Sequence, residues 1–265
     1  MASISTITSS RRLSAKFQEL SANSRKALVC YLTAGFPDRA RSVETLKAVA
    51  AAGADVIEVG IPFSDPIADG PVIQASSQRA LDQGMDFDDA LEIIREAALD
   101  IPIVLFTYLN PLISAGPDAL ARAADAGVSG VLITDLPVGA DASLERWLGN
   151  SALDFVRLVA PTTPRDRMQE IARNGGGFVY LISRLGVTGM RNDIPVDLKA
   201  SVQMLRSCTD LPICIGFGVS TPAQAREVAS LADGVVVGSA LVEASEKSPS
   251  AAGELVAAMR SALDG

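Results

Sequence analysis

The chain has 265 residues, of which 48% are hydrophobic and 20% charged, and its formal net charge is −8. A chain of this length and composition can bury a substantial core, so it is not intrinsically disordered. The acidic balance argues against nucleic acid or an anionic membrane as a partner, and no apolar run reaches the roughly 18 residues that cross a bilayer. Three cysteines without metal-ligand spacing predict neither a metal site nor a disulfide framework, and they favour the reducing cytoplasm.

No histidine occurs anywhere in the sequence. Histidine is the commonest general base and the commonest metal ligand of proteins. Its absence excludes a Ser-His-Asp triad. Acid–base chemistry near neutral pH must therefore fall to carboxylates, Tyr, Lys or Cys.

The first segment, residues 1–14, is rich in Ser and Thr and has no acidic side chain. We expect a flexible N-terminal tail that precedes a short helix. The alternative is the remnant of an organelle transit peptide, because such peptides share this composition. Residues 15–265 contain no linker or low-complexity stretch, and we expect them to form one catalytic domain.

Short, mostly apolar segments follow one another along this domain, and each is typical of a parallel strand buried on both faces. In chain order they are Ala27–Leu32, Val56–Gly60, Ile103–Thr107, Gly130–Thr134, Phe155–Val159, Phe178–Ile182, Ile213–Phe217 and Gly234–Val237. Ala-rich amphipathic segments between them predict helices, such as Ala40–Ala52, Phe87–Ala98, Asp118–Ala126 and Ala223–Ser230. Eight strand–helix pairs in about 250 residues indicate an α/β fold of the (β/α)8 TIM-barrel type, with a doubly wound open sheet as the alternative.

Glu58 stands in the second predicted strand, where the similar segment of the last strand has Val236. Burying an unpaired charge costs several kcal/mol, so this carboxyl group needs an explanation. One is a buried structural ion pair. The other is a catalytic group at the C-terminal mouth of the barrel, where barrel enzymes place their active sites. The apolar neighbours Ile57 and Val59 favour the neutral acid, which suits a group that both gives and takes a proton.

The stretches after the second and sixth predicted strands are longer than the others, and extra length in such loops is usually functional. The first carries Asp65 and Asp69 among three prolines and a glycine. Either acid alone would fit a turn or a helix cap. Together with Glu58, they predict that one of the two is a second catalytic carboxylate.

Glycine-bearing turns follow the last three predicted strands. The loop 183–194 contains glycines that allow it to act as a lid. Gly216-Phe217-Gly218 and Gly238-Ser239 each stand before a predicted helix. Each is an ordinary tight turn when taken alone. Backbone N–H groups in these two positions of a barrel commonly bind phosphate, so we expect a phosphate site there.

The run Glu58–Pro71 closely resembles the signature of the tryptophan synthase alpha subunit family. Ser183–Gly189 resembles the lid loop of the same family, and Tyr31–Gly35 and the two glycine turns agree in order and position. The resemblance covers roughly residues 15–260 and excludes the N-terminal extension. It implies a lyase of tryptophan biosynthesis that splits indole-3-glycerol phosphate into indole and glyceraldehyde 3-phosphate by retro-aldol cleavage.

The resemblance also implies roles for single residues. Glu58 would protonate the indole carbon that bears the side chain and accept the proton of the side-chain hydroxyl, and Asp69 would stabilise positive charge at the indole nitrogen. Tyr180 would lie beside Glu58, and Thr188 would meet Asp69 when the lid closes. The phosphate would be held by Gly189, Gly218, Gly238 and Ser239. The indole pocket would be walled by Tyr31, Tyr108, Leu132 and Phe217.

A partner is implied in the same way. Family members pair with a pyridoxal-phosphate beta subunit that receives the indole, in an alpha2-beta2 heterotetramer, and no cofactor or metal is expected in this chain. Candidate contacts are Pro62, Asp65 and Asn110-Pro111.

Three other functions stay open from the sequence. One is a stand-alone lyase that releases free indole, and another is a different phosphate-sugar barrel, which would lack the loop with Asp65 and Asp69. The third is a catalytically inactive barrel, which loss of Glu58 or Asp69 would have favoured.

Overall fold

The computed structural model describes residues 10–182, 196–216 and 218–265, and the structural statements below concern these residues. Parallel strands pair in chain order and close into a barrel, in which β8 pairs with β1. The strands are β1 (Ala27–Thr33), β2 (Val56–Gly60), β3 (Ile103–Thr107), β4 (Val128–Ile133), β5 (Asp154–Val159), β6 (Val179–Ile182), β7 (Ile213–Gly216) and β8 (Gly234–Val237). The predicted TIM barrel is confirmed.

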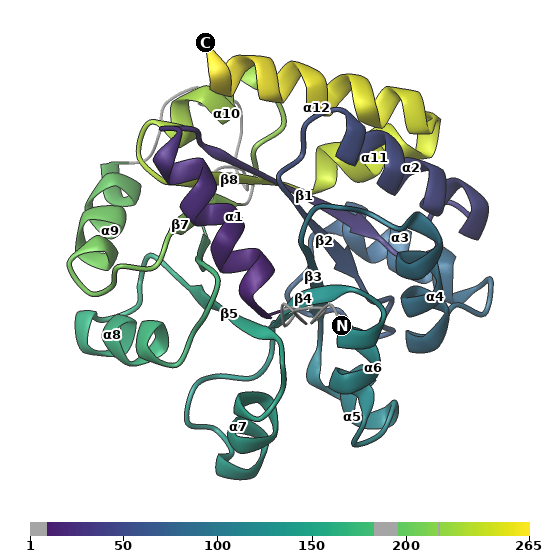
Figure 1. The fold of residues 1–265 in the computed structure, drawn as a ribbon, viewed down its shortest axis with the longest axis horizontal. Helices are drawn as coiled ribbons and strands as arrows, with labels where there is room; N and C mark the ends of the chain where they lie inside the picture. Colours follow the sequence, from purple (N-terminus) through teal and green to yellow (C-terminus); the bar gives the residue numbers. More distant parts are fainter. Residues whose placement is uncertain (1–9, 183–195, 217) are drawn as a thin grey trace, which may run out of the picture.

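The helices form a ring around the barrel, with the exception of the first (Figure 1). They are α1 (Ser10–Ala22), α2 (Arg39–Ala51), α3 (Pro71–Leu81), α4 (Phe87–Ala97), α5 (Leu109–Ser114), α6 (Ala119–Asp125), α7 (Ala142–Gly149), α8 (Arg165–Arg173), α9 (Val196–Arg206), α10 (Pro222–Ala229), α11 (Ser239–Lys247) and α12 (Pro249–Asp264). Several begin at a side-chain cap. Asp86 and Thr221 form capping boxes with Asp89 and Gln224, which satisfies backbone N–H groups that a helix start leaves free.

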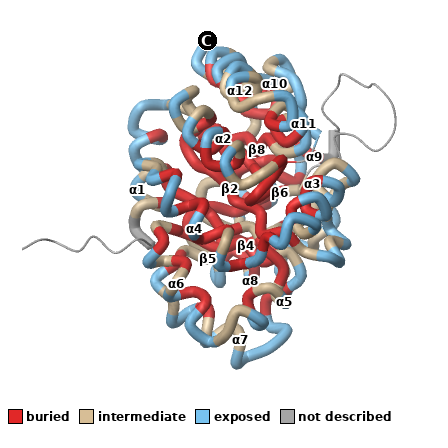
Figure 2. The backbone as a smooth tube through the Cα atoms, turned by 90° about the vertical axis from the view of Figure 1, so that its right-hand side faces the viewer, coloured by how far each residue is buried: buried red, intermediate tan, exposed pale blue. Residues whose placement is uncertain are grey.

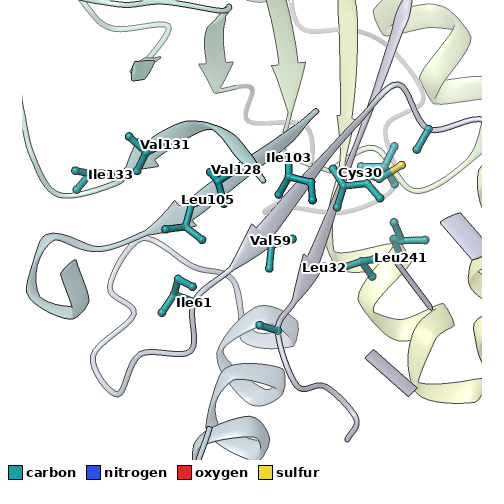
Figure 3. Close-up of a cluster of buried hydrophobic side chains, with 14 of the residues drawn as sticks. Cys30, Leu32, Val59, Ile61, Ile103, Leu105, Val128, Val131, Ile133 and Leu241 are labelled. Carbon is teal, nitrogen blue, oxygen red and sulfur yellow. The ribbon is translucent and has the colours of Figure 1, made fainter. Parts of the chain in front are cut away.

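Alternation along the strands divides the buried core into two layers. One set of strand side chains packs outward against the helices, as Figure 3 shows for Cys30 and Leu32 of β1 beside Leu241 of α11. The other set, which includes Val29, Val56 and other small or branched residues, fills the barrel interior. Figure 2 shows the buried backbone gathered in the strands, with exposed positions on the surrounding helices. Most strands are thus buried on both faces, which explains their apolar sequences, and β5 is the least buried of them.

Helix α1 crosses one end of the barrel instead of joining the ring (Figure 1). Its residues Leu13, Phe17 and Leu20 are buried with the interior cluster, and the Phe17 ring lies 5.3 Å from that of Phe178, just before β6. The helix therefore closes the N-terminal end of the barrel, and the opposite end stays available for a site.

The start of α1 differs from the predicted boundary of the tail. The helix includes Ser10, and Leu13 is fully buried, so residues 10–14 belong to the folded domain. Their Ser-rich, acid-free composition suggested a tail, but one apolar residue in contact with the barrel is enough to dock the turn. Residues 1–9 lie outside the described chain.

No helix among the described residues is long and apolar enough to span a lipid bilayer.

Candidate active site

Glu58 points into the barrel because it shares the inward phase of β2 with Val56, a member of the interior cluster. The residue is only 1% exposed. Neither of its carboxyl oxygens has a hydrogen-bond partner in the described part of the chain. A buried carboxyl group without a partner is rare in folded proteins, because it loses hydration and gains nothing in return.

Asp55, which immediately precedes β2, shows what a structural carboxylate looks like in this fold. It is also buried, but it accepts a hydrogen bond from the Leu28 backbone N–H at 2.8 Å and forms an ion pair with Arg260 at 3.0 Å. Glu58 has no comparable cation among the described residues. The alternative of a structural ion pair at Glu58 is therefore wrong within that part of the structure.

Burial also decides the protonation of Glu58. Desolvation disfavours the charged form and raises the pKa of Glu58 to about 8. The carboxyl group is consequently largely protonated at neutral pH. It can give a proton to a bound molecule and take one back, as a general acid–base requires.

Two tyrosines stand near Glu58 inside the mouth. Tyr31 of β1 is in register with Glu58. The pKa of the Tyr180 hydroxyl, on β6, is raised by burial and then by the charge of Glu58. Glycines make room for both rings, since a Cβ at Gly60 would overlap the Tyr31 hydroxyl and one at Gly216 would overlap that of Tyr180. Side chains from strands far apart in the sequence thus come together near Glu58.

Asp69 lies in the loop between β2 and α3, in a turn closed by its own N–H, which donates to the Pro66 carbonyl at 3.0 Å. It does not cap α3, because the N-cap residue is Gly70. The explanation of Asp69 as a helix cap is therefore wrong. Partial burial raises its pKa to about 6, while a hydrogen bond to the Tyr108 side chain opposes the rise. The group is mostly ionised at neutral pH.

Tyr108, expected as a wall of the indole pocket, lies directly after β3 and reaches this turn. Its hydroxyl accepts a hydrogen bond from the Ala68 N–H at 2.9 Å and contacts the Asp69 carboxylate. Burial, and then the charge of Asp69, raise the pKa of Tyr108 to about 12. The ring packs at 5.0 Å from Phe63. Tyr108 thus supports the loop that carries Asp69, a contact that the sequence did not predict.

The charges of Glu58 and Asp69 both affect the pKa of the Tyr31 hydroxyl. Burial raises its pKa first, then the charge of Asp69, and Glu58 adds a smaller contribution. The Tyr31 side chain is therefore close enough to both carboxyl groups for their charges to act on it. The mouth therefore combines a protonated acid and a carboxylate whose pKa values are pushed apart, the arrangement that divides acid and base roles in many enzymes.

The two turns that are expected to bind phosphate differ in whether a side chain already caps the helix that follows. Gly218 has φ of +85°, which favours glycine. The start of α10 beyond it is filled by the Thr221–Gln224 capping box. Gly238 is the N-cap of α11 and makes no side-chain cap, so the first N–H groups of that helix, beginning at Ser239, remain open to an anion.

The remaining predicted residues divide into two groups. Leu132 of β4 is fully buried in the barrel interior. Thr188 and Gly189, with the expected lid 183–194, and Phe217 lie outside the described residues. Phe106 was not predicted from the sequence, and its ring meets that of Tyr31 edge-on at 5.1 Å. Strand alternation could have found it, since it shares the inward phase of β3 with Val104.

Comparison with known proteins agrees with this geometry. The family described as "Tryptophan synthase alpha chain" matches residues 17–263. A relative of that name from Desulfatibacillum aliphaticivorans is 50% identical over 231 residues, which are 84% of this chain and 86% of the relative. One from Geobacter sulfurreducens is 43% identical over 95% of this chain and 97% of its own length. The solved structure of tryptophan synthase subunit alpha from Legionella pneumophila has a TM-score of 0.87 at 37% identity, covering 96% and 98% of the two chains.

The chain belongs to the tryptophan synthase alpha chain family. Membership makes it an enzyme, a lyase of tryptophan synthesis. The stand-alone lyase is not favoured, because the matching relatives are named as chains of tryptophan synthase.

One surface feature lies beside the mouth of this alpha chain fold. Pro62, Asn110 and Pro111, expected as partner contacts, line a single groove between the loop after β2 and helix α5. Asp65 is exposed one residue beyond Ser64, which also lines the groove. Ile113 of α5, which precedes Ser114 of the groove lining in the sequence, leaves 52% of its surface exposed.

Proposed function

We propose that this chain cleaves indole-3-glycerol phosphate to indole and glyceraldehyde 3-phosphate, with Glu58 as the general acid–base and Asp69 as the electrostatic partner of the indole nitrogen. The observation that carries the proposal is the buried Glu58 carboxyl group, which has no hydrogen-bond partner in the described chain and a pKa raised to about 8. A buried carboxyl group with a raised pKa and no hydrogen-bond partner is typical of a catalytic acid that acts on a bound substrate.

Glu58 and Asp69 together suffice for the proton transfers and the charge stabilisation that the cleavage requires. Neutral Glu58 gives its proton to the indole carbon that bears the side chain, and positive charge develops at the ring nitrogen. Asp69, ionised at neutral pH, stabilises that charge. The resulting Glu58 carboxylate takes the proton of the neighbouring side-chain hydroxyl, a carbonyl forms, and the carbon–carbon bond breaks. Its electron pair restores the aromatic ring and neutralises the nitrogen, and Glu58 is protonated again.

Around these acids, Tyr31, Tyr108, Leu132, Tyr180 and Phe217 would wall the indole pocket. Gly189, Gly218, Gly238 and Ser239 would hold the phosphate. Support for the phosphate site comes from the uncapped start of α11 at Gly238, since backbone N–H groups at a helix N-terminus favour an anion. Thr188 would complete the site by meeting Asp69 when the lid closes.

We further propose a pyridoxal-phosphate beta subunit as the cytoplasmic partner, in an alpha2-beta2 assembly in which indole passes from this chain to its partner. The groove lined by Pro62, Asn110 and Pro111 supports a docking surface next to the mouth. Charged residues are depleted at the centre of such interfaces, where apolar anchors carry most of the affinity.

Ile113→Asp tests this surface. Ile113 is 52% exposed and belongs to the same helix as Pro111 and Ser114, which line the groove. A charge there should weaken binding of the beta subunit by about 10-fold or more, because an apolar anchor is lost and a charge must be desolvated. Cleavage by the isolated alpha chain should not change. Met204→Asp on α9, where Met204 is 41% exposed, is the matched control and should bind normally. Equal binding by both variants would remove the groove from the interface.

The reaction itself is tested by following indole and glyceraldehyde 3-phosphate from purified protein and indole-3-glycerol phosphate, with and without a beta subunit. We expect both products in equal amounts, and faster turnover with the partner present. No cleavage in either condition would contradict the proposed function. A rate that the partner leaves unchanged would contradict the two-subunit assembly.

A further inference from the structure

We propose that Gln74 is a positioning residue that fixes the orientation of the Asp69 carboxylate by holding the turn that carries it. The proposal rests on the role given above to Asp69. It concerns a residue of α3 that does not itself reach the barrel interior.

Few interactions within the turn that carries Asp69 stabilise it. The Ile67 N–H donates to the Asp65 carbonyl at 2.9 Å, and the Asp69 N–H donates to Pro66 at 3.0 Å. Ile67 is 85% exposed, so the turn packs little apolar surface of its own. Its orientation must therefore come from contacts with neighbouring elements.

Two side chains from outside the turn supply such contacts within the described chain. Tyr108 binds it on one side, through the Ala68 N–H. Gln74 binds it on the other, where its Nε2 donates to the Asp69 carbonyl at 2.8 Å and to the Pro66 carbonyl at 3.3 Å. Both partners are acceptors, so the nitrogen of the amide must face the turn. A single NH₂ group thereby joins the two ends of the turn.

Gln74 can act as a fixed point because α3 is anchored to the barrel. Two residues further along the helix, Ser76 is buried, and its Oγ lies 2.7 Å from Oγ1 of Thr33, at the end of β1. The Thr33 hydroxyl lies 3.5 Å from that of Tyr31. The Asp69 main chain is thus tied through Gln74 and α3 to the strand that carries Tyr31.

Loss of the Gln74 amide would free the Asp69 carbonyl while the Tyr108 contact remained. The turn could then rotate about that contact, and the carboxylate would swing toward solvent. Misplacement of a catalytic group by about 1 Å can cost on the order of 100-fold in rate. We expect a smaller effect, because the turn remains tethered on one side and the lost hydrogen bonds are exposed to water.

The test compares Gln74→Met with Gln78→Met. Met keeps the length and the helix propensity of Gln but cannot donate. Gln78 lies one turn further along α3, is exposed, and donates to Asp82 at 2.8 Å, so it controls for loss of a surface amide. Gln74→Met should lower kcat by about 10-fold with little change in KM, because substrate affinity depends mainly on the phosphate. Gln78→Met should match the wild type. Equal activity of the two variants overturns the proposal.

A second readout separates positioning from a general structural effect. In protein labelled at the aspartate carboxyl carbons, the pKa of Asp69 should fall in Gln74→Met, because burial is the main cause that raises it. In an Asp69→Asn background, Gln74→Met should have no further effect on the cleavage rate.

The outcomes are distinguishable from failure of the proposed function. If Asp69→Asn cleaves normally, the role of Asp69 is wrong. If Asp69→Asn is impaired but Gln74→Met leaves the pKa of Asp69 unchanged, or adds its full effect in the Asp69→Asn background, Gln74 does not act through Asp69.

Discussion

At the level of single residues, Glu58 and Asp69 differ in how completely the fold removes them from water. Glu58 is sealed between β1 and β3 inside the barrel, whereas Asp69 stands in a loop and keeps a hydrogen bond to Tyr108. Complete burial therefore leaves Glu58 mostly protonated at neutral pH, whereas partial burial and the hydrogen bond to Tyr108 leave Asp69 mostly ionised. No histidine is needed for this division.

The pH dependence of cleavage follows from the state of Glu58. The proposed first step uses the protonated acid, and the pKa of Glu58 is about 8. The value of kcat/KM should thus fall as the pH rises through about 8, by about 10-fold for each further pH unit. The substrate phosphate does not interfere, since its second pKa is near 6. A rate that stays constant to pH 10 would contradict the assignment.

Which site residues can be predicted from sequence depends on how local their signal is. Glu58 was predictable because strand alternation fixes its direction, and the inward phase of a barrel strand normally holds apolar residues. The contact between Tyr108 and Asp69 was not, because it depends on how a proline-rich turn folds back over β3. The same holds for Gln74, whose sequence context is that of an ordinary exposed helix residue.

At the level of elements, the two turns proposed to bind phosphate differ in the number of backbone N–H groups that they leave free for an anion. α10 uses its own capping box at Thr221, whereas α11 begins at Ser239 after the N-cap Gly238, which provides no side-chain cap. The free backbone N–H groups, which an anion could use, are therefore at α11.

Gly238→Val tests this element. A Cβ at Gly238 would lie 3.8 Å from both Ile73 and Tyr31, at ordinary contact distance, so the fold should tolerate the change. The branched side chain would cover the N–H groups of α11 and should raise KM by about 10-fold or more, with a smaller effect on kcat. The wild type should prefer the phosphorylated substrate strongly over its dephosphorylated form, and the variant should lose most of that preference. An unchanged preference would place the phosphate elsewhere.

Helix α1 closes the N-terminal end of the barrel, and we expect it to stabilise the fold. Leu13 is fully buried against the barrel floor. Leu13→Ala should lower the free energy of unfolding by roughly 2–5 kcal/mol, as for other buried leucines. Gln18→Ala, at an exposed position of the same helix, should change it by less than about 0.5 kcal/mol. Urea denaturation measures both, and equal stabilities would show that α1 is not part of the cooperative core.

The strands were easier to predict than this helix. Most barrel strands are buried on both faces, so their sequences are largely apolar runs with clear ends, although β2 carries Glu58 and β5 carries Asp154 and Arg157. The start of α1 has no such run. Its single buried leucine lies among serines and arginines, and only the three-dimensional floor of the barrel shows why the helix docks there.

At the level of the whole molecule, α1 seals one end of the barrel while the carboxyl groups, the open start of α11 and the groove beside α5 gather at the other. The chemistry and the proposed partner surface are therefore neighbours. A product released at the mouth would leave beside the surface where we place the beta subunit.

Cleavage of indole-3-glycerol phosphate by Glu58→Gln tests the central claim most directly. Gln keeps the shape but cannot transfer the proton, so kcat should fall on the order of 10²–10⁴-fold. The fold should persist. The pKa of Glu58 in the folded protein lies above its ordinary 4.5, so the wild type loses stability as the pH rises from about 4.5 to about 8, and Gln removes this loss. At pH 7.5 the variant should therefore be at least as stable as the wild type in urea, yet nearly inactive. A folded variant that cleaves at near-normal rate would contradict the account.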